Sequence, residues 1–245
     1  MAEPLKTDTI LNHLAELRQT LLWALVFVLM GFALSAFWAK DLYHLLTLPL
    51  VRVLPKGSHF IATHPFEAWI TYLKTAFFAG LFLSLPMIFW QFWHFVSPGL
   101  YKKEKKVGVL FVVLASVFFV GGALFGYFVV FPFTFDFFIG ILQGTDIVFL
   151  PQMKDYVGLA FGLLVAFGII FELPIFIIIL TAFKIVNFKK LMGFQKYMIL
   201  IAFVIGAVLT PPDAVTQFLM AIPIIALYEI GLLLSWIFSR SSPSP

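Results

Sequence analysis

The sequence predicts an all-α polytopic membrane protein with six transmembrane helices. Hydrophobic residues make up 62% of its 245 residues and charged residues only 11%, whereas soluble domains contain about 25% charged residues. Several apolar runs are long enough to cross a bilayer, which takes about 20 residues. Because lipid offers no water to an open backbone, such runs are expected to be helical. We therefore expect one integral membrane domain over residues 1–245 and no separate soluble domain.

Apolar runs, and the residues that end them, define the expected spans. Residues 1–18 carry leucines at helical spacing with charges on other faces, which predicts a short amphipathic helix on the membrane surface. The second span is expected to be interrupted at Pro86 and to end at Pro98 and Gly99. The fifth is short for a full crossing, which favours thinned lipid or a tilted neighbour. The predicted spans are residues 21–38, 66–96, 107–131, 156–183, 197–209 and 215–238.

The lysines and arginines predict the orientation of the chain. They are concentrated in the short loops on the side of the termini, at Lys102–Lys106 and Lys184–Lys196. By the positive-inside rule both termini are then cytoplasmic, an N-in and C-in topology. The two long loops, residues 40–65 and 133–155, are expected outside as a cap with some helical pieces.

A lone carboxylate, Glu172, lies well inside the fourth predicted span. A charge at the centre of a lipid-facing helix costs on the order of 3 kcal/mol, so Glu172 is expected to face protein or water. Pro174 removes a backbone N–H and crowds the preceding turn, so the helix is expected to bend beside the carboxylate. A bent helix holding an acid at membrane depth suggests a lined cavity. The alternative is that Glu172 is paired internally or lies nearer the interface.

Other local patterns point to packing rather than chemistry. The G-x-x-x-G patterns at Gly122–Gly126 and Gly158–Gly162 predict close helix packing. His94, beside Trp90 and Trp93, is more typical of an interface anchor than of a titrating site. No catalytic, nucleotide-binding or metal-binding motif appears at the spacing its chemistry requires, and the chain has no cysteine. The sequence therefore predicts no enzyme, no cofactor and no bound metal.

Carboxylates are the remaining candidate functional groups. Glu16 and Glu104 are predicted at the cytoplasmic face among basic residues, where exposed acids are most often solvated ion pairs. Glu172 and Glu229 lie within spans and could form the proton relay of a proton-coupled small-solute transporter. Such carriers usually have two repeated halves with broken helices in corresponding places, and no repeat is detected.

Four segments, spread over nearly the whole chain, carry a family resemblance. They are HLAELR at His13–Arg18, SPGLYKKEKK at Ser97–Lys106, FELP at Phe171–Pro174 and LTPPDAVTQFLMAIPIIALYEIG at Leu209–Gly231. In this order they closely resemble the TatC family, the receptor and core subunit of the twin-arginine protein translocase. Thr63–Glu67 also resembles the family's entry to the second helix.

The resemblance implies a six-helix fold with a concave, glove-like face in the inner (cytoplasmic) membrane, and a role in binding twin-arginine signal peptides of precursor proteins. An arginine guanidinium presents a planar fork that a carboxylate accepts with two charge-assisted hydrogen bonds, so two spaced carboxylates could hold an arginine pair. The resemblance assigns this role to Glu16 and Glu104. Neighbouring residues expected to shape the patch are Leu17, Arg18, Phe95 and Tyr101.

The family also implies single-span partners, the TatA and TatB proteins, in a complex of several copies driven by the proton-motive force. Polar groups that could receive their helices are Glu172, Thr210 and Gln217. A hydrogen bond to a partner's polar side chain in lipid is worth about 1 kcal/mol. Such a gain suits reversible recruitment better than a permanent bundle.

Overall fold

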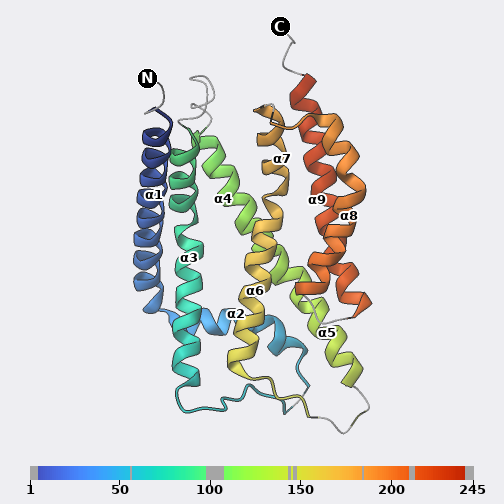
Figure 1. Ribbon diagram of the computed structural model, residues 1–245. Helices are drawn as coiled ribbons and strands as arrows, with labels where there is room; N and C mark the ends of the chain where they lie inside the picture. The colour runs from blue at the N-terminus through green and yellow to red at the C-terminus, as the bar shows by residue number, and fades with distance from the viewer. Residues whose placement is uncertain are drawn as a thin grey trace. The chain divides into compact units, whose positions relative to one another are not determined.

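The computed structural model describes residues 5–55, 57–97, 108–142, 145, 148–183, 185–209 and 213–240, without the side chains of residues 5–12 and 238–240. These residues form a succession of helices, shown in Figure 1. The helices are α1 (Leu5–Ala36), α2 (Ala39–Val53), α3 (Glu67–Val96), α4 (Gly108–Phe125), the π-helical turn η3 (Gly126–Val130), α5 (Phe131–Leu142), α6 (Met153–Phe171), α7 (Leu173–Ala182), α8 (Phe188–Leu209) and α9 (Ala214–Arg240).

Six helical stretches in the described part of the chain are long and apolar enough to cross a membrane, as the composition predicts. They are His13–Ala36, Glu67–Val96, Gly108–Leu142, Met153–Ala182, Phe188–Leu209 and Ala214–Ile237. The chain packs as two compact units, Met1–Leu45 with His64–Val117, and Leu46–Thr63 with Phe118–Pro245.

The first unit is built on the pairing of α1 with α3, which Figure 1 draws side by side. Two glycines allow this approach: a Cβ placed on Gly80 would lie 2.5 Å from the backbone carbon of Gly31. Next to this crossing, the Ser84 hydroxyl lies 2.7 Å from the carbonyl oxygen of Phe27 on α1 and 2.7 Å from that of Gly80 on its own helix. Small residues and a hydroxyl at the contact are typical of membrane helices, which gain little from apolar burial alone.

The second unit has its core among α6, α7, α8 and α9. Its buried residues include Ile177, Ala202 and Ile224. Two polar contacts join the helices of this core. The Tyr228 hydroxyl donates to the carbonyl oxygen of Leu191 at 2.7 Å, and the Ser235 hydroxyl donates to Thr181 Oγ1 at 2.9 Å.

One long loop is tied to the start of α6 in this unit. The backbone N–H of Ile61 donates to the carbonyl of Pro151, and that of Met153 donates back to Ile61. The Tyr156 hydroxyl donates to the carbonyl of Leu46 in α2 at 2.7 Å. These bonds satisfy backbone groups of an otherwise irregular segment.

Two predicted interruptions are absent from the first unit. The helix expected over residues 1–18 and the span expected from residue 21 form one helix, because α1 runs unbroken from Leu5 to Ala36. The polar residues between them, Gln19 and Thr20, are compatible with a helix, so nothing in the sequence ends it. Likewise α3 continues through Pro86 to Val96; proline is tolerated in membrane helices where neighbouring groups satisfy the freed carbonyls.

Helix ends also differ from the prediction in the second unit. The helix expected to end near residue 131 continues through η3 and α5 to Leu142. Pro132 does not end it, because its missing N–H falls beside the π-helical turn, where the hydrogen-bond register already changes. Helix α8 begins at Phe188 rather than near residue 197 and has 22 residues. The expected shortness of the fifth span, and with it the argument for thinned lipid, is therefore wrong.

The two G-x-x-x-G patterns have different outcomes. A Cβ on Gly122 would lie 2.3 Å from the carbonyl oxygen of Phe167, so the first pattern is a close α4–α6 contact as predicted. Gly158 and Gly162 on α6 have no atom within 4 Å of such a Cβ and are exposed. Within the described chain the second pattern therefore makes no close helix contact.

Candidate functional site

Glu16 lies on the exposed face of α1. The exposed fraction of its side chain is 56%, and its Oε2 lies 3.5 Å from Nδ1 of His13, one turn earlier. A contact between side chains this exposed contributes little to stability. The carboxylate is therefore available to a stronger cationic ligand.

Phe95 of α3 joins this carboxylate through His13. The rings of His13 and Phe95 are stacked, with centroids 4.5 Å apart and planes 20° apart. The pairing of α1 with α3 thus brings Glu16 and Phe95, which were predicted to share a site, to one place. Leu17 and Arg18 are also exposed on this part of α1. The other two predicted members, Glu104 and Tyr101, lie outside the described residues.

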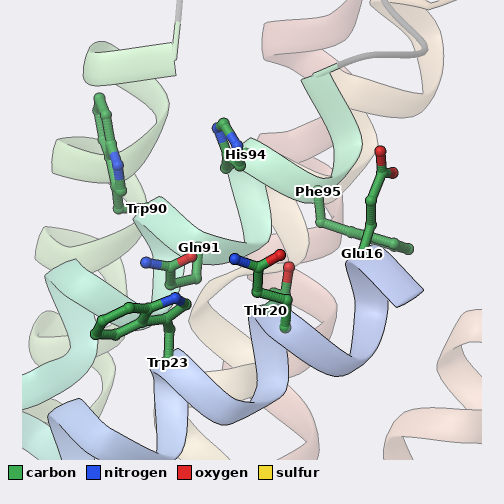
Figure 2. A pocket seen from close by; sticks show the side chains of 8 residues that line it. Glu16, Thr20, Trp23, Trp90, Gln91, His94 and Phe95 are labelled. Atoms are coloured by element: carbon green, nitrogen blue, oxygen red, sulfur yellow. The ribbon is translucent and has the colours of Figure 1, made fainter. Parts of the chain in front are cut away.

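A groove continues from Glu16 between α1 and α3. It encloses a cavity of about 290 Å³. Figure 2 shows the Glu16 carboxylate at one end, the Trp23 indole at the other, and the Gln91 amide above Trp23. Its lining residues are Glu16, Gln19, Thr20, Trp23, Trp90, Gln91, His94 and Phe95.

The sequence analysis did not single out the amides of this groove. Gln19 and Gln91 are polar residues near the ends of long apolar runs, and this position could have marked them as candidates. Nothing in the sequence, however, indicates that α1 packs against α3. His94 and Trp90 are exposed, as expected of interface residues. Trp93, between them, is buried: the centroid of its ring lies 4.9 Å from that of Phe111, and a Cβ on Gly108 would clash with it.

The second candidate site, Glu172, lies where the fourth membrane stretch breaks. Helix α6 ends at Phe171 and α7 begins at Leu173, so the helix breaks at the place where a bend beside Pro174 was predicted. Glu172 Oε1 is buried and has no hydrogen-bond partner in the described part of the chain. A buried acceptor left unpaired costs free energy, so a donor that reached it would bind favourably.

Gln217, by contrast, is paired within the chain. Its Nε2 donates to the carbonyl oxygen of Phe203 on α8 at 3.0 Å. Thr210 lies outside the described residues.

Glu172 and Gln217 lie at different levels of the second unit. A Cβ on Gly231 would lie 3.1 Å from the Cα of Pro174, so the α6–α7 break is level with this part of α9. About 14 residues of α9 separate Gly231 from Gln217, or about 21 Å at 1.5 Å per residue. A single polar group of a partner helix could therefore meet one of the two but not both.

Glu229, the second acid of the transporter alternative, is also paired. Gln195 Nε2 of α8 donates to Glu229 Oε1 of α9. This pair joins two neighbouring helices of the second unit, so its arrangement is that of an internal contact.

Comparison with known proteins gives consistent results over nearly the whole chain. The sequence model of the family described as Sec-independent protein translocase protein (TatC) matches residues 12–223. The Sec-independent protein translocase protein TatC of Desulforapulum autotrophicum is 42% identical over 95% of this chain and 86% of that protein. The corresponding protein of Escherichia coli K12 is 38% identical over 94% of this chain and 88% of that protein. A crystal structure of the twin-arginine translocase receptor TatC matches with a TM-score of 0.81 and 36% identity, covering 93% of this chain and 100% of that chain.

Proposed function

The chain belongs to the TatC family of Sec-independent protein translocase components, and from this premise we propose that it is the subunit that binds twin-arginine signal peptides. The family membership leaves the small-solute transporter alternative without support, and it describes a translocase component rather than an enzyme. The observation that carries the proposal is the exposed Glu16 carboxylate beside Phe95, at the junction of α1 and α3.

The chemistry of this place suits an arginine side chain. A guanidinium can take both oxygens of an exposed carboxylate in parallel hydrogen bonds and can stack its plane on an aromatic face. Glu16 supplies the carboxylate, and the His13–Phe95 stack supplies aromatic faces next to it. Glu104, assigned by family resemblance, is proposed to take the second arginine.

The proposed orientation places this site in the cytoplasm of a cell whose inner membrane the chain spans. Lys189, Lys190 and Lys196 are exposed in the first turns of α8, which the positive-inside rule places on the cytoplasmic side. Because the chain has no cysteine, single cysteines can test this topology. Labelling from outside is expected at Thr145 but not at Lys190; outside labelling at position 190 would refute the orientation.

Partner helices of the TatA and TatB type are proposed to contact the second unit. The unpaired Oε1 of Glu172 is the group that offers them a new hydrogen bond. Gln217 already donates to Phe203, so a partner would contact its carbonyl end or replace that bond.

The test of signal-peptide binding is a titration with two peptides that differ only in carrying paired arginines or paired lysines. The protein is held in nanodiscs, as wild type, Glu16→Gln, Glu104→Gln and the control Asp41→Asn, an exposed acid at the other end of the same unit. Each glutamate variant is expected to bind the arginine peptide about tenfold more weakly. This is the smallest loss expected for a hydrogen bond to a charged group, because exposure of Glu16 to water weakens the interaction. The control should bind as wild type.

Lysine keeps the charge but not the planar fork, so wild type should prefer the arginine peptide. If both glutamate variants keep that preference unchanged, Glu16 and Glu104 are ordinary surface charges and the arginine site lies elsewhere.

A further inference from the structure

The groove between α1 and α3 extends well beyond the Glu16 carboxylate. From Glu16 to Trp23 it follows α1 for about 10 Å, and the Glu16 and Trp23 side chains stand at its opposite ends in Figure 2. An arginine side chain bound at Glu16 would leave the part lined by Gln19, Thr20 and Gln91 unfilled. The deeper part of the groove therefore has room for a ligand other than arginine.

The groove lies at the boundary between headgroups and acyl chains. Trp69, near the start of α3, and Trp90, near its end, are both strongly exposed. About 21 residues of continuous helix separate them, or about 32 Å, which matches the hydrocarbon thickness of a bilayer. Exposed tryptophans at this separation mark the two membrane interfaces. Trp90 and the neighbouring Gln91 are therefore at headgroup depth.

The polar groups of the groove are arranged by charge. Glu16 is the one carboxylate among the lining residues, and no lysine or arginine is among the described residues that line the groove. Deeper in the groove are neutral hydrogen-bonding groups, the amides of Gln19 and Gln91 and the hydroxyl of Thr20. The apolar faces of Trp23 and Trp90, each about half exposed, border them.

This arrangement selects among membrane ligands. Glu16 repels a purely anionic head group, and none of the described lining residues is a lysine or arginine that would offset the carboxylate. A head group that ends in an ammonium and carries a phosphate next to it matches this order: the ammonium would contact the carboxylate, and the phosphate would contact the neutral donors. A primary ammonium also donates hydrogen bonds to the carboxylate, whereas a quaternary ammonium cannot.

We propose that the groove binds the head group of an ethanolamine phospholipid, with the ammonium at Glu16, the phosphate at the side chains of Gln19, Thr20 and Gln91, and the acyl chains along Trp23 and Trp90. A polypeptide segment is the other class of ligand with polar groups at this spacing. The exposed indoles at interface depth favour the lipid, because acyl chains can pack on their apolar faces. If Glu16 also binds arginine, which rests on the proposed function, lipid and peptide compete for one carboxylate.

The experiment uses the full chain without any peptide, so its result is independent of the proposed function. Lipid retention is measured by native mass spectrometry for phosphatidylethanolamine, its mono- and dimethyl derivatives, phosphatidylcholine and phosphatidylglycerol, all with the same acyl chains. Wild type is expected to retain phosphatidylethanolamine about tenfold more strongly than phosphatidylcholine, with a stepwise fall as N–H groups are methylated. This series needs no variant and so does not depend on a mutant's folding.

Variants locate the site. Glu16→Gln is expected to remove the preference for phosphatidylethanolamine over phosphatidylcholine, and Gln91→Leu to lower the retention of both. Trp69→Leu, at the other end of α3, is the control and should retain lipids as wild type. Equal retention of the two lipids by wild type, or an unchanged preference in Glu16→Gln, would overturn the proposal. So would a Gln91→Leu variant that keeps its lipids but binds twin-arginine peptide more weakly, because the groove would then be a peptide site.

Discussion

Substituting alanine for Gly80 should separate α1 from α3. The new Cβ would lie 2.3 Å from the backbone nitrogen of Phe32 and 2.5 Å from the backbone carbon of Gly31. Both neighbours are main-chain atoms, so no side chain can turn away. Restoring ordinary contact distances requires the helices to part by about 1 Å.

The cost can be estimated from overpacking in other proteins. Forcing a methyl group into a close-packed contact costs about 1–3 kcal/mol, which corresponds to a fall in Tm of about 2–12 °C for a chain of this size. The separation would also stretch the hydrogen bond from Ser84 to Phe27. Because α1 carries Glu16 and α3 carries Phe95, twin-arginine peptide affinity should fall as well.

The assay is thermal unfolding in detergent of Gly80→Ala beside Gly121→Ala. Gly121 is also helical, but a Cβ there meets no atom within 4 Å. Its substitution removes the conformational entropy cost of glycine and should leave Tm unchanged or raise the stability by up to about 1 kcal/mol. Equal melting temperatures for Gly80→Ala and wild type would show that the helices are not held at this contact.

Three further substitutions test local interactions. His13→Phe keeps an aromatic ring on α1 but removes the imidazole nitrogen that contacts Glu16. The carboxylate is then free for the ligand, so arginine-peptide affinity in the nanodisc titration should rise by up to about fivefold; a fall would mean that His13 itself contacts the ligand. Glu172→Ala removes a buried acceptor that has no partner among the described residues, so thermal unfolding should show no loss of stability. Site-specific crosslinks to a TatA-type or TatB-type helix should change. Unchanged crosslinks would assign Glu172 to internal packing. Desolvation acts to raise the pKa of Asp213 and is the largest single effect, but hydrogen bonds from Thr216 and from the backbone of Val215 together hold that pKa below its ordinary value. The carboxylate therefore stabilises the start of α9 above the ordinary value, and this contribution is lost as the pH falls through the folded pKa. Asp213→Asn keeps a helix cap and should lose this acid-dependent part of the Tm, measured between pH 7 and pH 3; an identical pH profile would show that Asp213 makes no such contribution.

The sequence predicts the fold class and the membrane stretches because lipid imposes one dominant requirement, an apolar helix of sufficient length. The interruption at Glu172 was predictable for a similar reason, since Pro174 acts on the turn beside it. Helix ends were harder. The continuity of α1 past residue 18 and the start of α8 at Phe188 concern mixed polar segments, where helix formation depends on neighbours rather than on hydropathy.

The candidate site was predicted only in part. The motif around Glu16 and the position of Phe95 could be found by resemblance, and the structure brings them together through His13. The groove beyond them could not be predicted, because Gln19 and Gln91 are far apart in sequence and become neighbours only when α1 packs on α3. For the same reason the burial of Trp93 against Phe111 was missed.

The unbroken α1 helix has a mechanical consequence. It crosses α3 at Gly31, about 15 residues or about 22 Å from Glu16, but only about 5 residues or about 7 Å from its other end at Ala36. On the Glu16 side of this crossing the helix is held to α3 twice more, by the Ser84 hydroxyl at the carbonyl oxygen of Phe27 and by the stack of His13 on Phe95. Because all three contacts lie on one continuous helix, the Glu16 carboxylate keeps a fixed position relative to α3.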